Sequence, residues 1–132
     1  MNILNCPCGN KKTYADCCKK VHSNILNATT AEKLMRSRYT AFTQSNIDYL
    51  IKSWSPKTCD NSIKAKREIK KWASSVNWIK LEIINSTKGQ PKDLTGTVVF
   101  KAYYFENGQV NCIHENSLFT KENNHWVYLN GL

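Results

Sequence analysis

The segment LTGTVVFKAYYFENGQVNCIHENSLFTK, residues 94–121, contains the strongest structural signal in this chain. A run rich in Val, Phe and Tyr, residues 94–106, and a second predicted strand, residues 109–121, flank the dipeptide Asn107-Gly108. Both turn residues tolerate positive φ, which a two-residue hairpin turn requires. The segment therefore predicts a long antiparallel hairpin.

Two further strands extend this hairpin in sequence order. Residues 78–87 read as a strand that precedes it, joined through the turn 88–93. Residues 125–129 read as a strand that follows it, after the turn Asn123-Asn124. Short connections between consecutive strands favour neighbours in one sheet. We expect an antiparallel meander.

Three amphipathic helices are predicted before the sheet. The first begins at Thr29-Thr30-Ala31-Glu32, which fits a capping box, and runs to about Phe42. The second begins near Ser45 or Asn46 and ends at Ser55-Pro56, and the third begins near Asp60. Helices followed by a meander predict an α+β fold, with a curved sheet wrapped around the helices like a cone.

The composition is that of a globular protein, and its positive net charge suits either an acidic partner or solubility. It has 132 residues, 41% hydrophobic residues and a formal net charge of +9. Such a charge favours nucleic acid, ribosomal RNA or an acidic protein as a partner, and it serves solubility equally well. No run approaches the roughly 18 apolar residues of a membrane helix, and the N-terminus has no apolar signal region. We therefore expect a cytoplasmic protein without membrane contact.

Four of the six cysteines form the strongest motif. The string Cys6-Pro7-Cys8-Gly9 is followed by residues 10–16 and then by the adjacent pair Cys17-Cys18. Four thiolates suit one tetrahedral Zn²⁺, and they leave no open position for a reacting water. We predict one structural zinc ion per chain, held by Cys6, Cys8, Cys17 and Cys18. The alternatives are two disulfides or free thiols; Cys59 and Cys112 lie apart from the motif.

Residues 1–20 need this metal, because they contain almost no apolar periodicity from which a core could form. Residues 21–28 read as a connector to the first helix. The string around the cysteines resembles the SEC-C motif, best known from the C-terminal tail of the bacterial secretion ATPase SecA. That tail docks on an acidic export chaperone and on the ribosome, so the resemblance implies a docking role for residues 1–20.

The rest of the chain resembles the YchJ family of bacterial proteins. The resemblance rests on LMRSRYTAF at residues 34–42, DYLIKSW at 48–54, Trp78, ENSLF at 115–119 and residues 126–131. It implies a SEC-C module over residues 1–20 and a domain similar to nuclear transport factor 2 over residues 27–132. That fold has a pocket between sheet and helices, and the resemblance assigns no activity.

One arginine stands out on the first helix. At ~100° per residue, Arg38 lies in the middle of the apolar face of Leu34, Met35 and Phe42. A guanidinium that faces a core needs a carboxylate or a wet pocket, and we predict a pair with Glu115. This pair either fixes packing alone or belongs to a ligand pocket. The pocket candidates are Arg38, Tyr39, Trp54, Glu115 and Trp126.

Three functions remain open at this point. The first is a binding or adaptor protein, with the zinc module docking a protein or ribosomal partner and the cone binding a small ligand or peptide. The second is an enzyme that uses the pocket around Arg38 and Glu115, and the third is a ribosome or RNA binder driven by charge. We find no nucleophile–base pair, carboxylate pair or phosphate-binding loop, so we assign no catalytic residue and consider an enzyme the weaker hypothesis. Monomer and dimer both stay open.

Overall fold

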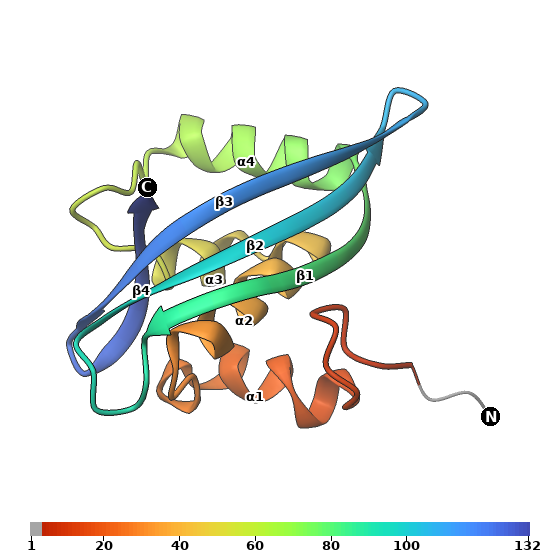
Figure 1. Ribbon diagram of the computed structural model, residues 1–132. Helices are drawn as coiled ribbons and strands as arrows, with labels where there is room; N and C mark the ends of the chain where they lie inside the picture. The colour runs from red at the N-terminus through yellow and green to blue at the C-terminus, as the bar shows by residue number, and fades with distance from the viewer. Residues whose placement is uncertain (1–3) are drawn as a thin grey trace.

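The computed structural model describes residues 4–132, in which six helical segments precede four strands (Figure 1). The first three residues of the predicted zinc module lie outside this range. The helical segments are the short 3-10 turns η1 (Tyr14–Asp16) and η2 (Ile25–Asn27) and the helices α1 (Cys18–Ser23), α2 (Ala31–Thr43), α3 (Ile47–Lys52) and α4 (Ile63–Ser75). The strands are β1 (Asn77–Lys88), β2 (Thr95–Glu106), β3 (Gln109–Glu122) and β4 (His125–Gly131).

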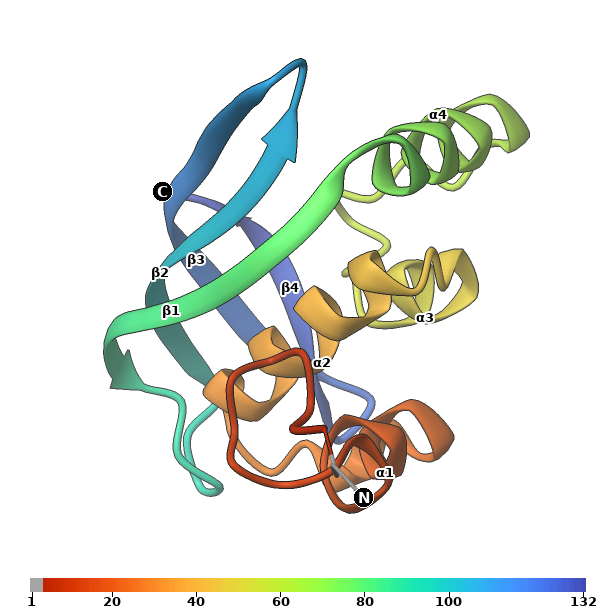
Figure 2. The same ribbon diagram turned by 90° about the vertical axis from the view of Figure 1, so that its right-hand side faces the viewer.

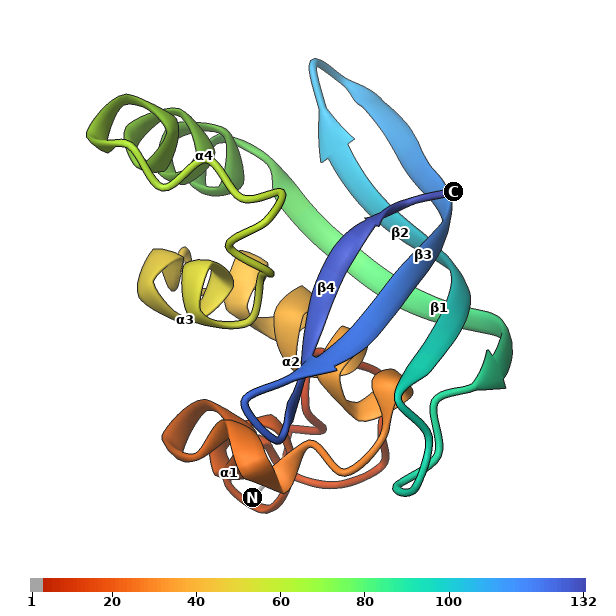
Figure 3. The same cartoon turned by 90° about the vertical axis from the view of Figure 1, so that its left-hand side faces the viewer.

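The four strands form one antiparallel sheet in the order β1-β2-β3-β4, as the meander predicts. Asn107 and Gly108 both have positive φ, 54° and 76°, and they close the β2–β3 hairpin. Irregular pairings interrupt the ladders between β1 and β2 and between β3 and β4. Such bulges bend strands, and the sheet curves around the helices, which lie on its concave side (Figures 2 and 3).

Helix α2 is the central element of the helical layer. Its N-cap is Thr30, whose hydroxyl accepts the Lys33 N–H at 3.1 Å, one residue after the predicted capping position. Glu32 consequently does not close a capping box and instead pairs with Arg36 one turn later, at 3.0 Å. The helix packs against β1, β2 and β4 and fixes which side chains face the interior of the cone.

The structure contains one α-helix more than the three predicted. Helix α1 begins at Cys18 and occupies part of the segment interpreted as a connector, and η2 follows it. Val21 and Ile25 from this segment are buried in the main core. Val21 is the only aliphatic residue among the six of α1, so no apolar stripe at helical spacing marks this helix in the sequence.

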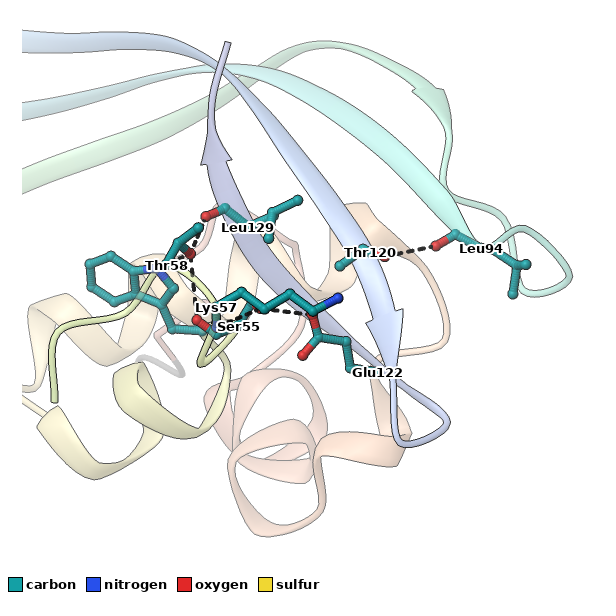
Figure 4. Close-up of polar contacts among 8 residues, drawn as sticks. Ser55, Lys57, Thr58, Leu94, Thr120, Glu122 and Leu129 are labelled. Atoms are coloured by element: carbon teal, nitrogen blue, oxygen red, sulfur yellow. Dashed lines mark hydrogen bonds and ion pairs between the residues drawn. The ribbon is translucent and has the colours of Figure 1, made fainter.

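The loop after α3 is bound to β4 and to the last residue of β3, Glu122 (Figure 4). The Ser55 N–H donates to the Tyr128 carbonyl at 2.7 Å, and the Ser55 hydroxyl donates to the Glu122 carboxylate at 2.7 Å. The Thr58 hydroxyl donates to the Leu129 carbonyl at 2.5 Å. These bonds place Trp54 beside Tyr128, with ring centroids 5.6 Å apart, at one end of the cone.

Between residues 4 and 132, no helix is long and apolar enough to cross a membrane.

Candidate metal centre and the cavity of the cone

The four cysteines of the motif meet at one point. The sulfur atoms of Cys6, Cys8, Cys17 and Cys18 all lie within 4.8 Å of one another. Three of these residues are buried and Cys17 is half-buried, and none is in a disulfide. Together with Tyr14 they make a small core of their own, separate from that of the cone.

The first two cysteines are positioned by a closed loop. The Cys6 N–H donates to the Lys12 carbonyl at 2.7 Å, and Asn5 pairs with Thr13 in an isolated bridge. Within the loop the Gly9 N–H donates to the Cys6 carbonyl at 3.1 Å, and Gly9 has a φ of +95°. Only glycine adopts this φ readily, so the Cys-x-Cys-Gly string is itself the turn that brings the two sulfurs together.

Helix α2 of the cone supplies a second layer of contacts to the sulfurs. The Thr40 hydroxyl donates to the Cys18 sulfur at 3.3 Å and lies 3.7 Å from the Cys6 sulfur. Thr40 is fully buried, so this hydroxyl has little access to water. From the loop itself, the Asn10 amide donates to the Cys17 sulfur at 3.4 Å. These donors stabilise negative charge on sulfur.

Arg36, on helix α2, binds the cysteine loop to that helix. Its Nη1 donates to the Cys8 carbonyl at 2.7 Å, while its Nε pairs with Glu32. The sequence pattern does not mark Arg36, Thr40 or Asn10 as parts of the site. Their roles depend on how α2 lies against the loop, and spacing along the chain does not contain that information.

The cluster fits a thiophilic tetrahedral ion. With Zn–S bonds of ~2.3 Å, the edges of a sulfur tetrahedron measure about 3.8 Å. The Cys8 and Cys17 sulfurs are 3.6 Å apart, and the largest separation in the set stays below 4.8 Å. The donor set is four soft sulfurs without any carboxylate, which suits zinc far better than magnesium or calcium.

The cluster also favours thiolate formation at Cys8. A hydrogen bond from the Cys18 thiol lowers the pKa of Cys8 to about 5, against the opposing effect of burial. The same hydrogen bond, together with burial, raises the pKa of Cys18, and burial raises the pKa of Cys17. Metal binding would displace the remaining protons, since thiolates are the ligands.

A basic cleft of about 290 Å³ adjoins the cluster. It reaches Cys17 and Cys18 and is bordered by residues of the loop, α1 and α2. Its charged lining residues are one acid, Asp16, and four cations: Lys12, Lys20, Lys33 and Arg36.

A second cavity, of about 210 Å³, lies inside the cone between the helices and the concave face of the sheet. Its wall is largely aromatic and aliphatic, and its polar groups are Arg38, Glu115, Ser117 and Tyr128. The apolar lining residues are Met35, Tyr39, Phe42, Trp54, Trp72, Trp78, Phe100, Ala102 and Ile113. Of the five pocket candidates, Arg38, Tyr39, Trp54 and Glu115 border it.

Arg38 and Glu115 face the same cavity but do not form the predicted ion pair. The Arg38 Nη1 donates to the Leu50 carbonyl at 2.9 Å and to the Ser53 hydroxyl at 2.7 Å. Glu115 accepts the Ser117 hydroxyl at 2.6 Å and the Tyr128 hydroxyl at 3.0 Å. The prediction of a direct pair is therefore wrong, because β4 brings Tyr128 into contact with both side chains.

Tyr128 contacts the two charged groups through different parts of its side chain. Its ring lies 4.9 Å from the Arg38 guanidinium carbon, and its hydroxyl is bound to Glu115. Burial, with the nearby Glu115 charge, raises the pKa of Tyr128 to about 12, so the phenol stays protonated. Burial lowers the pKa of Arg38 to about 10, which still leaves the guanidinium charged at neutral pH.

Trp126 does not border the cavity, which corrects its place among the pocket candidates. It is 1% exposed, and its indole N–H donates to the Thr29 carbonyl at 3.3 Å, just before α2 begins. Arg38 lies about 12 Å farther along that helix at a rise of ~1.5 Å per residue. The aromatic residues that complete the cavity are Phe42, Trp72, Trp78, Phe100 and Tyr128, which the sequence pattern does not mark as pocket residues.

Comparisons with known proteins agree with this arrangement. The family model described as "YchJ, middle NTF2-like domain" matches residues 30–131. A UPF0225 protein of Corynebacterium glutamicum is 40% identical, over 96% of this chain and 94% of its own length. A UPF0225 protein of Vibrio parahaemolyticus is 39% identical, over 96% of this chain and 74% of its own length.

Two solved structures have the same fold. The solution structure of a SEC-C motif containing protein from Rhodopseudomonas palustris superposes with a TM-score of 0.84, at 30% identity, over 98% of both chains. The crystal structure of a SEC-C motif containing protein from Psychrobacter arcticus superposes with a TM-score of 0.78, at 30% identity. That match covers 97% of this chain and 81% of the other.

Proposed function

The chain belongs to the YchJ family, and we propose that it acts as a binding protein with a structural metal ion. One Zn²⁺ held by the four cysteines stabilises a docking lobe, residues 5–23, which binds an acidic segment of a partner protein. The cavity of the cone binds a small ligand. The observation that carries the docking role is the basic cleft beside the metal centre.

The proposed zinc ion is structural. Four cysteine ligands complete a tetrahedron, and a hydrolytic zinc site needs one position open to water. The lobe has only a very small core around the cysteines, so its folding depends on the free energy of metal binding. The ion thereby fixes the geometry of the adjoining cleft.

The charge of the cleft favours an acidic partner. The lining contains four cations and one acid, and a Zn²⁺ with four thiolates adds a formal charge of −2 beside them, so the positive potential of the cleft resides on its exposed lysine ammonium groups. A cleft of about 290 Å³ accommodates a few side chains of an extended peptide. Arg36 is already held by Glu32 and by the Cys8 carbonyl, so the three lysines are the groups available to a partner.

A protein segment fits this distribution better than RNA. A second group of exposed cations, including Lys64, Lys70 and Lys71, lies on α4, at the opposite end of the molecule from α1 (Figure 1). RNA binders typically present one continuous basic face that follows the phosphate backbone. Here the basic groups are dispersed, because Lys80, Lys88 and Lys101 lie on the sheet in addition to the groups at the cleft and on α4.

Metal content tests the first part of the proposal. Protein purified without chelators should contain one zinc per chain by elemental analysis. Cys112→Ser, a change at an exposed cysteine outside the cluster, should keep this ratio, while Cys8→Ser should lower it. A ratio well under one zinc per chain in the wild-type protein would overturn the assignment.

A labelled acidic peptide tests the docking role. The probe is a fluorescein-labelled decapeptide of Glu and Gly, and binding is followed by fluorescence anisotropy at low salt. Combined Lys12→Gln, Lys20→Gln and Lys33→Gln should weaken binding about 10-fold, at roughly 0.5 kcal/mol for each exposed pair. Combined Lys64→Gln, Lys70→Gln and Lys71→Gln removes the same charge from α4 and should have a much smaller effect.

The same assay separates the alternatives. Equal weakening by both triple variants would mean that net charge, and not the cleft, attracts the peptide. Tighter binding of a single-stranded RNA 12-mer than of the peptide, again weakened equally by both variants, would replace docking with RNA binding. Either result overturns the docking proposal.

A further inference from the structure

The cavity of the cone holds a buried cation, Arg38, that forms no ion pair with an acid among the described residues. Arg38 is 5% exposed, and within residues 4–132 no carboxylate lies within ion-pair distance of it. Both of its hydrogen bonds come from Nη1, and they end on the uncharged Leu50 carbonyl and Ser53 hydroxyl. Because a buried charge is costly unless it is paired, Arg38 is the group in this cavity that an anion would complement.

Glu115, the other charged group of the cavity, is already provided with partners. Its carboxylate accepts the hydroxyls of Ser117 and Tyr128, at 2.6 and 3.0 Å. Both bonds end on Oε1, and because Glu115 is only half-buried its side chain stays partly open to water, whereas Arg38 is buried. The unmatched charge is therefore positive, and a cationic ligand would have to compete with Arg38 across the same small space.

The remaining groups around Arg38 favour a flat anion. The rings of Trp54 and Tyr128 lie 5.4 and 4.9 Å from the guanidinium carbon, so two aromatic side chains flank the charge. The unused donors of a guanidinium form a planar fork, and a carboxylate matches that fork with two parallel hydrogen bonds.

The apolar wall limits the body of the ligand. Phe42, Trp72 and Trp78 contact one another, with the two indole centroids 5.3 Å apart, and Phe100 and Ile113 continue the wall on the sheet. An engineered apolar cavity of about 150 Å³ binds benzene, so about 210 Å³ suits one ring with a short side chain. Trp54, Trp72 and Trp78 are half-buried, so part of each of these lining side chains is open to solvent.

We propose that the cavity is a binding site for a small monocarboxylate with a single aromatic ring, its carboxylate anchored by Arg38. The ring of the ligand packs among Phe42, Trp72 and Trp78. The negative charge of Glu115, in the same cavity, disfavours a ligand that carries a second carboxylate. This inference rests on the small-ligand part of the proposed function and names the class of ligand.

Three probes with the same ring and different charge test the class. They are 3-phenylpropionate, its neutral amide and 3-phenylpropylamine, each titrated by calorimetry into the metal-loaded full chain at pH 7.5. The acid should bind once per chain with a dissociation constant below about 1 mM. The amide should bind at least about 10-fold more weakly, because it lacks the charged hydrogen bonds, and the amine should bind more weakly still.

Nuclear magnetic resonance of the unaltered protein gives a readout that no folding defect can imitate. The indole N–H signals of Trp54, Trp72 and Trp78 should move on addition of 3-phenylpropionate, because these rings border the cavity. The signal of Trp126 should stay in place, since its N–H is bound to the Thr29 carbonyl outside the cavity.

Variants separate the anchor from the rest of the cavity. Arg38→Lys keeps a cation and should retain part of the affinity, while Arg38→Met should lose at least about 10-fold. Arg67→Met, on the exposed side of α4, removes the same group elsewhere and should leave binding unchanged. Glu115→Gln should bind the acid as tightly as the wild type or more tightly, and a loss there would contradict the proposed charge.

The outcomes also separate this inference from the proposed function. Equal or tighter binding of the amide or the amine would overturn the carboxylate anchor and leave a ligand-binding cavity. No shift of the cavity tryptophans with any of the three probes would overturn both the ligand class and the small-ligand role. The zinc and docking assignments depend on other measurements and would be unaffected.

Discussion

At the scale of single residues, Thr40 connects the two parts of the molecule. Its hydroxyl contacts the sulfurs of Cys6 and Cys18 in the cysteine cluster. Its backbone belongs to α2, the helix that lines the cavity of the cone. A threonine in the middle of a helix gives no sequence signal, because its role depends on the loop packed against it. The cysteine spacing accordingly predicts which four thiols come together but not the hydroxyl that contacts them.

Thr40→Val should weaken metal binding by roughly 10-fold, because it removes a hydrogen-bond donor to sulfur and nearly preserves the side-chain shape. Competition with a chromophoric zinc chelator measures the change. Thr43→Val is the matched control: that hydroxyl lies one turn later and donates to the Thr40 carbonyl at 2.6 Å, without a bond to sulfur. Equal zinc affinity of Thr40→Val and the wild type would show that the hydroxyl does not support the site.

At the scale of elements, two tight turns depend on glycine at positive φ. One brings the sulfurs of the cysteine loop together, and the other closes the β2–β3 hairpin. Gly9 has a φ of +95° and Gly108 a φ of +76°. A Cβ at Gly9 would meet only ordinary contacts, 3.4 Å from the Leu81 carbonyl and 3.5 Å from the Arg36 Nη1, and a Cβ at Gly108 would meet nothing within 4 Å. Substitution at either site therefore tests the backbone conformation itself.

Gly9→Ala and Gly108→Ala should each destabilise the protein by about 1–2 kcal/mol, the cost of placing an L-residue at positive φ. Chemical denaturation of the metal-loaded protein measures this loss. Only Gly9→Ala should also lower zinc affinity, because only that turn positions ligands. A loss of zinc affinity in both variants would mean that the metal site responds to the stability of the whole domain and not to its own loop.

At the scale of the whole molecule, the lobe and the cone have separate cores of very different size. The larger cluster holds sixteen buried residues and includes Val21 of helix α1 at the end of the lobe, whereas the smaller cluster consists of the three buried cysteines. Helix α2 joins them, through Thr40 and through the bond from Arg36 to the Cys8 carbonyl. The cysteine-containing segment of the lobe, residues 5–18, should thus be able to unfold while the cone stays folded.

Removal of the metal tests this division. A strong zinc chelator should abolish hydrogen-exchange protection in residues 5–18 and leave the amides of β2 and β3 protected, because the sheet keeps its own core. Protection in α2 should fall only near Arg36 and Thr40. Simultaneous loss of protection in lobe and sheet would contradict the division and would make the metal part of the folding of the entire chain.

The features that the sequence predicts correctly are those that local rules govern. The hairpin at Asn107-Gly108, the four strands, the three amphipathic helices α2, α3 and α4 and the spacing of the four cysteines all depend on residues close together in the chain. Turn preferences and periodicity act over such short distances, so the order of residues is enough to predict these elements.

Which distant side chains meet depends instead on tertiary packing. The helical face of Arg38 follows from periodicity, but its partners do not, because Tyr128 arrives from the last strand and the Leu50 carbonyl from the next helix. The residue type of Trp126 suggests a place in the cavity, although β4 carries it toward the start of α2. A charge buried without a carboxylate, and the cavity beside it, result from packing between segments far apart in the sequence, which no local pattern encodes.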